Sequence, residues 1–467
     1  MSIINQLLAT AIMCYTSAVL GLLSALPSST MKLFISENTP LNRVMTETEV
    51  SLMGSISCVS TLIMTPFCGC LLDVFGRKRS MILFFLPQLL AWMLLVSLNS
   101  VEAFICAMFL CGLSGSIFLI VPVYINEFCD SSIRGALSSS VAISFGVGVL
   151  VSYGLGGILE YSIYNYTGLC LAVISLILLY FLRESPFYLM GKGFEKEATS
   201  SIAFYKGLEP ECKEVIAEIQ YLSQLLENNI TKNDDIEEME RLTSEVKQPT
   251  QKLSTLKFLR ESASTRRALV VLIILYTTCI FQGLVIVQIF AKSLFAIAIP
   301  SMSSNLSSVI FGLILVLSGC FGTYLVEAVG RRTLLIVSSI ATGVLCVILG
   351  TQLQFQWGSG WLTAVLIYVY TITYSFGAGS VPYILIGEIF LPQIRSFAST
   401  LALEWAYFCN FVLLFIFTPL FNAFGLGPIF HIFGGFSFFT ALFAFIYLPE
   451  TKNLPVDVIQ RKFLERN

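Results

Sequence analysis

Charged side chains are scarce in this sequence of 467 residues: Asp, Glu, Lys and Arg make up 12% of it, against about 25% in an ordinary soluble protein. Histidine occurs once, at His431, so no Cys and His set with metal-ligand spacing can form. The sequence also lacks a Ser-His pairing, a phosphate-binding loop and a basic stripe. These absences exclude a soluble enzyme and a nucleic-acid-binding protein, and they predict that the chain has no cofactor and no metal.

Long apolar runs take up most of the sequence, since hydrophobic residues account for 56% of it. A helix needs about 20 apolar residues to cross a bilayer. The runs are continuous and do not alternate, which disfavours membrane strands. We therefore expect an all-α membrane protein with twelve transmembrane helices. The expected spans are 7–27, 50–72, 80–98, 102–125, 136–159 and 167–182 in the first half, and 268–290, 306–326, 333–351, 361–386, 397–420 and 428–448 in the second.

The few charges are unevenly spread, and half of them lie between Arg183 and Arg267. This stretch predicts a polar insert of short helices, in which the segment from Glu211 to Leu226 has apolar residues at helical spacing. The acidic and polar segment from Asn228 to Thr250 is typical of a solvated linker. The predicted parts are a six-helix bundle at 1–182, a helical insert at 183–267, a second six-helix bundle at 268–450 and a short tail at 451–467.

The basic residues predict the orientation in the membrane. Only Lys32, Arg43 and Lys292 fall in loops on one side of the predicted spans, and all other Lys and Arg fall on the opposite side. By the positive-inside rule, the insert and both termini are cytoplasmic. Asn165 and Asn305 then open candidate N-glycosylation sequons on the outer side. Lys292 ends the seventh span and is interpreted as a lysine that snorkels to the membrane interface.

Three short patterns in the predicted cytoplasmic loops occur twice, in the same order. Each combines an acid with nearby bases or turn residues. Their repetition indicates two six-helix halves in parallel repeat, which is one known plan for transporters. Ion pairs between the acids and bases could latch the halves in one conformation; alternatively, the bases only fix the topology. The three pairs are Asp73 and Arg77 with Glu327 and Arg331, Glu127 and Arg134 with Glu388 and Arg395, and Glu184 with Glu450.

These loops resemble those of the sugar porter family of the major facilitator superfamily. Within that family, the phrase from Pro122 to Glu127 is most similar to the insect facilitated trehalose transporters and their divergent relatives. The resemblance implies a central sugar site, a cytoplasmic helical insert and alternating access. The matching residues are Asp73, Gly76, Arg77, Lys78, Pro122, Tyr124, Glu127, Arg134, Gly135, Glu184, Ser185, Pro186, Glu327, Gly330, Arg331, Arg332, Glu388, Arg395 and Pro449 to Lys452.

The resemblance also implies a sugar-binding site, which this sequence keeps only in part. Gln282 matches a family glutamine, Gln288 stands at a family asparagine, and Tyr383 stands at a family tryptophan. Trp405 matches the family residue, and Glu404 before it is often asparagine in the family. We expect these five residues to contact the substrate. Further amides of the family site are replaced here, at Ala142, Gly283 and Leu315.

Coupling to protons is not expected from the resemblance. Proton-coupled sugar porters typically carry an acid in the first span and an arginine in the fourth, and the corresponding residues here are Thr16 and Ala107. We therefore expect a facilitative sugar uniporter for trehalose or a hexose in the plasma membrane. Two alternatives stay open: a sugar sensor without transport, which a long tail would favour, and a proton-coupled carrier that uses Glu404. Glu404 could equally pair with a nearby arginine or stay neutral.

Overall fold

The computed structural model describes residues 2–130, 133–224, 262–300, 302–452 and 454–465, and regular structure in these residues is helical. Among them, twelve helical segments are long and apolar enough to cross a membrane. The expected fold class and the number of spans are therefore confirmed. The first half contains α1 (Ser2–Ser24), α2 (Leu26–Ile35), α3 (Glu47–Phe75), α4 (Arg77–Ser97), α5 (Val101–Ser114), α6 (Ile117–Phe128), α7 (Arg134–Ile158) and α8 (Tyr161–Tyr180). The second half contains α13 (Ala263–Ile280), α14 (Leu284–Ile289), α15 (Ala291–Ala298), α16 (Ser304–Val329), α17 (Arg331–Phe355), α18 (Gly360–Phe376), α19 (Val381–Ile389), α20 (Pro392–Phe424) and α21 (Leu426–Tyr447).

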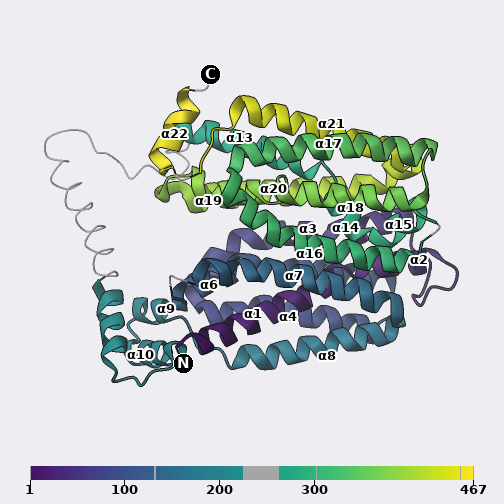
Figure 1. Ribbon diagram of the computed structural model, residues 1–467. Coiled ribbons are helices and arrows are strands. Elements are labelled where there is room, and N and C mark those ends of the chain that lie inside the picture. The colour runs from purple at the N-terminus through teal and green to yellow at the C-terminus, as the bar shows by residue number, and fades with distance from the viewer. Residues whose placement is uncertain (1, 131–132, 225–261, 301, 453, 466–467) are drawn as a thin grey trace, which may run out of the picture.

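The helices form two groups that lie side by side (Figure 1). Most buried apolar residues of α1–α8 belong to one cluster, and most of those of α13–α21 belong to another. Within the first group, α1 and α7 approach closely because Gly148 has no side chain: a Cβ there would lie 1.9 Å from the carbonyl oxygen of Ala18. The two groups meet mainly where α3 packs against α20 and α7 packs against α16.

Two helices of the second half are broken near their middle. Gly283 separates α13 from α14 and has φ +89°, a left-handed conformation that glycine adopts without strain. Gly377 to Ser380 separates α18 from α19, close to Pro382. Broken helices expose backbone groups at membrane depth, which is tolerated where they line a cavity or are buried in protein.

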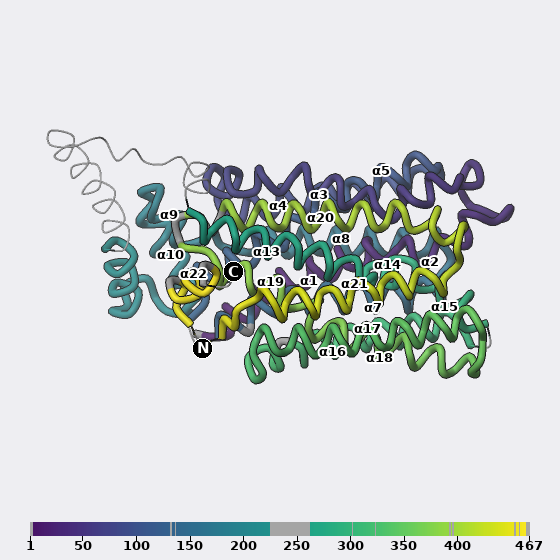
Figure 2. Tube along the Cα trace, turned by 90° about the horizontal axis from the view of Figure 1, so that it is seen from above, coloured from purple at the N-terminus to yellow at the C-terminus, as the bar shows by residue number. Residues whose placement is uncertain are grey.

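Both termini lie at one end of the molecule, together with the short helices α9 (Pro186–Gly191), α10 (Glu195–Lys206) and α22 (Val456–Glu465) (Figures 1 and 2). We call this the terminal end. The helices α2 and α15 lie at the opposite, distal end (Figures 1 and 2).

The described part of the polar insert folds against itself. Residues 213–224 are helical, and Val215 is fully buried against Ile202 and Ala203 of α10. Ile219 and Leu222 pack against the same cluster, as the apolar spacing predicted, whereas Ile216 is 45% exposed. The linker expected from Asn228 to Thr250 lies outside the described residues.

Candidate functional site

A cavity of about 290 Å³ lies beside the two helix breaks of the second half. Its polar lining includes Gln288 of α14, Ser375 of α18, Ser380 in the second break and Tyr383 of α19. Ser375 and Ser380 donate to backbone oxygens, so their lone pairs can still accept hydrogen bonds. Gln288 and Tyr383, two of the five residues expected to contact a substrate, thus line one cavity.

A chain of contacts leads from Tyr383, in the wall of this cavity, to aromatic side chains beside it. Tyr383 is 51% exposed and its ring packs edge-to-face on Tyr276 at 5.4 Å between centroids. Beside Tyr276, Thr277 accepts a hydrogen bond of 2.8 Å from Nε1 of Trp405. Trp405 also packs against Phe408 at 5.5 Å. The α13 residues 276 and 277 therefore connect Tyr383 to Trp405, and both rings stay accessible.

Gln282 points elsewhere. Its side chain is fully buried, and its Nε2 donates a hydrogen bond of 3.0 Å to Oγ1 of Thr440 on α21. Its backbone oxygen accepts from Tyr370 at 2.6 Å. In this conformation Gln282 braces the break between α13 and α14 rather than lining the cavity. A substrate contact by Gln282 stays a prediction.

Glu404 lies on α20, the helix that packs on α3 of the other half. Its Oε1 is buried and has no hydrogen-bond partner within the described part of the chain. The neighbouring groups include Tyr407 on the same helix and Cys68 of α3. Among the residues whose side chains are described, no arginine pairs with Glu404, so a half-buried carboxyl group with one buried oxygen lies where α20 packs on α3.

The acid–base motifs of the first half form a compact network at the terminal end. Arg77 is buried, and its Nη2 lies 2.7 Å from Oε1 of Glu127. The Oε1 of Glu184 accepts hydrogen bonds from the backbone N–H groups of Arg77 and Lys78, at 2.7 and 3.0 Å. Glu184 therefore binds the first turn of α4, where the positive end of the helix dipole favours an anion. Asp73, largely exposed, lies 3.9 Å from Arg77.

The second half repeats this network with its own residues. Arg331 lies 2.7 Å from Glu388 and 2.8 Å from Glu327. The carboxylate of Glu450 accepts hydrogen bonds from the N–H groups of Arg331 and Arg332, at 2.9 and 3.1 Å. The motifs that repeat in the sequence therefore make the same contacts in both halves. In each half an acid caps a helix, and a buried arginine joins neighbouring helix ends.

These ion pairs do not join the two halves in this conformation. Each arginine of the two networks pairs with acids of its own half. Arg134 donates to the backbone oxygen of Cys129, and the side chain of Arg395 lies outside the described residues. A latch between the halves stays a prediction for another conformation.

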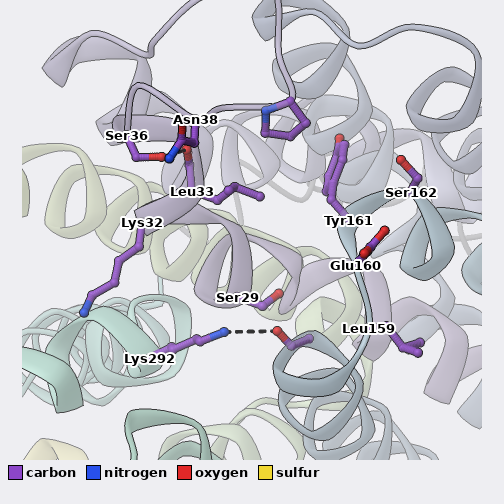
Figure 3. Close-up of a pocket in the computed structure, with 12 residues that line it drawn as sticks. Ser29, Lys32, Leu33, Ser36, Asn38, Leu159, Glu160, Tyr161, Ser162 and Lys292 are labelled. Carbon is purple, nitrogen blue, oxygen red and sulfur yellow. Dashed lines mark hydrogen bonds between the residues drawn. The ribbon is translucent and has the colours of Figure 1, made fainter.

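Direct hydrogen bonds between the halves are found at the distal end. Nζ of Lys292 in α15 donates a hydrogen bond of 3.0 Å to the carbonyl oxygen of Gly156 in α7 (Figure 3). The backbone N–H of Lys292 donates to Oγ of Ser28 in α2 at 3.1 Å. The hydroxyl of Tyr153 donates to the backbone oxygen of Gln288. The distal end is therefore closed, and Lys292 binds a carbonyl of the other half instead of only snorkelling.

The sequence of this chain matches a family described as "Sugar (and other) transporter" over residues 2–463. The chain belongs to this family. Sugar transporters of this family are not enzymes, and their fold is that of the major facilitator superfamily. An inward-open structure of the xylose transporter XylE from E. coli superposes with a TM-score of 0.76 over 97% of this chain and 98% of that one, at 18% identity.

Insect trehalose transporters are similar to this chain over nearly its full length. The facilitated trehalose transporter Tret1-1 of Drosophila sechellia is 26% identical over 99% of this chain, and the facilitated trehalose transporter Tret1 of Apis mellifera ligustica is 27% identical over 98%. The alignments cover 52% of the first relative and 88% of the second. This chain therefore spans about half the length of several relatives that it matches.

The two asparagines that open the predicted glycosylation sequons both pack against neighbouring helices. Asn165 is 1% exposed, and its Nδ2 donates to the backbone oxygen of Leu95 at 3.3 Å. Asn305 packs directly on the Cα of Gly157, where a Cβ would lie 1.8 Å from Oδ1 of Asn305. Asn305 is only partly buried, and N-glycosylation at Asn165 or Asn305 stays a prediction. The sequence shows the sequons and the Gly156–Gly157 pair, but it does not indicate which residues they contact.

Proposed function

We propose that this transporter is a facilitative uniporter that carries trehalose or a hexose by alternating access. The single observation that carries the proposal is the cavity beside the two helix breaks, where Gln288, Ser380 and Tyr383 converge. A sugar needs donors and acceptors for its hydroxyls and an apolar surface for its ring faces, and the amide, the hydroxyls and the aromatic rings supply both. Trp405 and Glu404 would complete the site after the two halves close on the substrate.

The proposed cycle moves the bundles 1–182 and 268–450 against each other around this cavity. The printed names of the insect relatives favour trehalose as a substrate to test. We further propose a plasma-membrane location with both termini and the terminal end in the cytoplasm, since the loops at that end carry most Lys and Arg residues.

Uniport is favoured over ion coupling because Thr16 and Ala107 stand where proton-coupled sugar porters carry an acid in the first span and an arginine in the fourth. Thr16 is fully buried and its hydroxyl donates to the backbone oxygen of Met13. Ala107 is fully buried as well. Neither side chain can gain or lose a proton within the cycle.

A proton-coupled carrier is the second candidate, and the position of Glu404 favours it. Placing a carboxyl group within the membrane costs free energy, so such a residue usually has a function. With a buried oxygen between α20 and α3, Glu404 could take up a proton on one side and release it on the other as the halves move.

Uptake into proteoliposomes separates these candidates. We expect labelled trehalose or glucose to enter saturably and to stop at equal concentrations, with or without an imposed pH gradient. Accumulation that requires the gradient, and that Glu404→Gln abolishes, would establish the proton-coupled carrier instead. No uptake of either sugar by folded protein would refute sugar transport by this cavity for both substrates.

A matched pair of glutamine variants tests the cavity itself. Gln288→Leu removes an amide from the cavity lining, and Gln220→Leu makes the same change at an exposed residue of the insert. Leaving a buried sugar hydroxyl unpaired costs about 1–3 kcal/mol, so we expect Gln288→Leu to raise KM by roughly 5- to 150-fold. Gln220→Leu should leave uptake unchanged, and equal effects of both variants would contradict the placement of the site.

A further inference from the structure

A pocket of about 630 Å³ lies at the distal end, where the two halves meet (Figure 3). We call it the distal pocket. It is separate from the cavity beside the helix breaks, and the two share no lining residue. The first half supplies most of its lining, and the second half supplies Lys292 of α15. Its polar lining includes Ser29, Lys32, Asn38, Glu160, Ser162 and Lys292.

Two lysines, one from each half, line this pocket. The ammonium of Lys292 is half-buried and donates one hydrogen bond, to the carbonyl oxygen of Gly156 at 3.0 Å. An ammonium has three N–H donors, so two remain for another acceptor. Lys32, in the last turn of α2, is exposed, and its ammonium forms no ion pair or hydrogen bond with any residue that the structure describes.

The two ammonium groups influence each other across the boundary between the halves. Burial, followed by the positive charge of Lys32, lowers the pKa of Lys292. Both causes act against a charged Lys292 in this conformation. Closure of the distal end therefore brings two like charges together, and this repulsion opposes the hydrogen bond to Gly156.

Glu160, the acid in the lining, does not neutralise these lysines. It is exposed at the start of α8, and within the described part of the chain it forms no ion pair. Figure 3 shows its carboxylate on the side of the pocket away from Lys32 and Lys292. The three charged groups of the lining together leave an excess of one positive charge, on the side where the halves meet.

We propose that the distal pocket binds one small oxyanion, which bridges Lys32 of the first half and Lys292 of the second. The oxygens of such an anion accept hydrogen bonds from both ammonium groups and turn their repulsion into attraction. The aliphatic side chains of the lining are those of Leu33, Pro40 and Leu159. These offer no wall for an acyl chain, so the anion comes from solution and not from a lipid headgroup.

The bridge requires lysines of both halves, so it forms only while the distal end is closed. A ligand that binds one of two conformations more tightly shifts the population towards that conformation. A bound oxyanion therefore favours the molecules in which the distal end is closed. This effect does not depend on which substrate the transporter carries.

Thermal unfolding of the full-length protein in neutral detergent tests the proposal, with inorganic phosphate as the probe. A ligand that binds the folded state raises the unfolding temperature saturably. Sodium chloride at equal ionic strength controls for screening of the two lysines. We expect phosphate to raise the unfolding temperature saturably and above the level in sodium chloride.

Single lysine variants test the bridge. Loss of one charged hydrogen bond should raise the phosphate concentration at half-saturation by roughly 10- to 100-fold in Lys32→Met and also in Lys292→Met. Lys32→Arg keeps the charge and should retain phosphate binding. Lys196→Met removes an exposed lysine of the insert and should bind phosphate as the wild-type protein does. Lys32 is exposed, so its two variants decide even if Lys292→Met does not fold.

Four results would overturn the proposal. An equal response to phosphate and sodium chloride would show that no oxyanion binds. Weaker binding in Lys196→Met as well would show that binding follows net charge and not this pocket. An effect of only one of the two pocket lysines would exclude a bridge between the halves. Stabilisation by glucose but not by phosphate, lost in Lys32→Met, would make the pocket a sugar site.

Discussion

Replacing Lys292 with methionine should open the distal end of the transporter. The Lys292 ammonium donates a hydrogen bond of 3.0 Å to Gly156, in the last turn of α7 (Figure 3). Methionine keeps most of the side-chain length but removes both the charge and the donor. This contact joins the two halves, so it stabilises only the state in which the distal end is closed, and its loss shifts the equilibrium towards the open state.

The free energy lost in Lys292→Met follows from the kind of contact that Lys292 makes. A hydrogen bond from a charged group contributes about 1.5–3 kcal/mol, and a cation at a helix carboxyl end contributes about 0.3–1 kcal/mol. Partial exposure of the pocket favours the lower part of these ranges. A loss of about 2 kcal/mol shifts the ratio of closed to open molecules by roughly 30-fold towards the open state.

Lys32 provides a matched control. It lines the same distal pocket, of about 630 Å³, but is exposed and belongs to α2 of the first half. Lys32→Met removes the same charge from the same pocket without removing the hydrogen bond to Gly156. We therefore expect a shift for Lys292→Met and little change for Lys32→Met.

Pulsed electron paramagnetic resonance measures the ratio directly. Spin labels at Asn38 and Trp357, in distal loops of the first and second halves, report the separation of the halves after the exposed native cysteines are replaced. The population at long distance should rise in Lys292→Met. An unchanged distribution, or the same shift in Lys32→Met, would refute the reasoning, because the hydrogen bond would then not hold the distal end closed.

Three further substitutions have defined outcomes. Gly157→Leu inserts a side chain where even a Cβ would lie 1.8 Å from Oδ1 of Asn305 in the other half, so the same spin labels should report an open distal end, and an unchanged distance would contradict this. Gly283→Ala has to adopt φ +89° and would place its Cβ 2.2 Å from the Phe433 ring; we expect a loss of about 3 kcal/mol, read as a lower thermal unfolding temperature, and wild-type stability would exclude the strain. Arg331→Met leaves two acids without their buried partner and should cost roughly 3 kcal/mol, whereas Arg43→Gln, in an exposed ion pair, should cost less than about 1 kcal/mol; the reverse order in thermal unfolding would contradict the argument.

The recurring motifs show how far the sequence could predict contacts. The pairs Arg77–Glu127 and Arg331–Glu388 have the same distance, 2.7 Å, in the two halves. The sequence grouped Arg77 with Asp73 and Arg331 with Glu327, each within one loop, and placed Glu127 and Glu388 in a different motif. The structure joins the two motifs of each half through Arg77 and Arg331. The sequence left open whether the pairs lie within one half or between halves, and the structure places both within a half.

Contacts within the membrane were less predictable. Gln282 and Gln288 lie six residues apart in a span that reads as one apolar run, yet Gln282 points to Thr440 and Gln288 lines the cavity. The break at Gly283 separates them, because it changes the direction of the chain and the rotation of the helix that follows. The contact between Lys292 and Gly156 likewise joins residues of different halves, and no spacing within either span indicates it.

The sequence by itself determined the class of the fold, the twelve spans and the twofold repeat. These follow from run length and local motif order, because a bilayer demands about 20 apolar residues per helix whatever the packing. Only the tertiary structure decided which polar side chains face the cavity, which brace a helix break and which join the halves. In a span that is apolar on all faces, periodicity does not mark the buried side, so helix rotation and partner choice emerge only when the helices pack together.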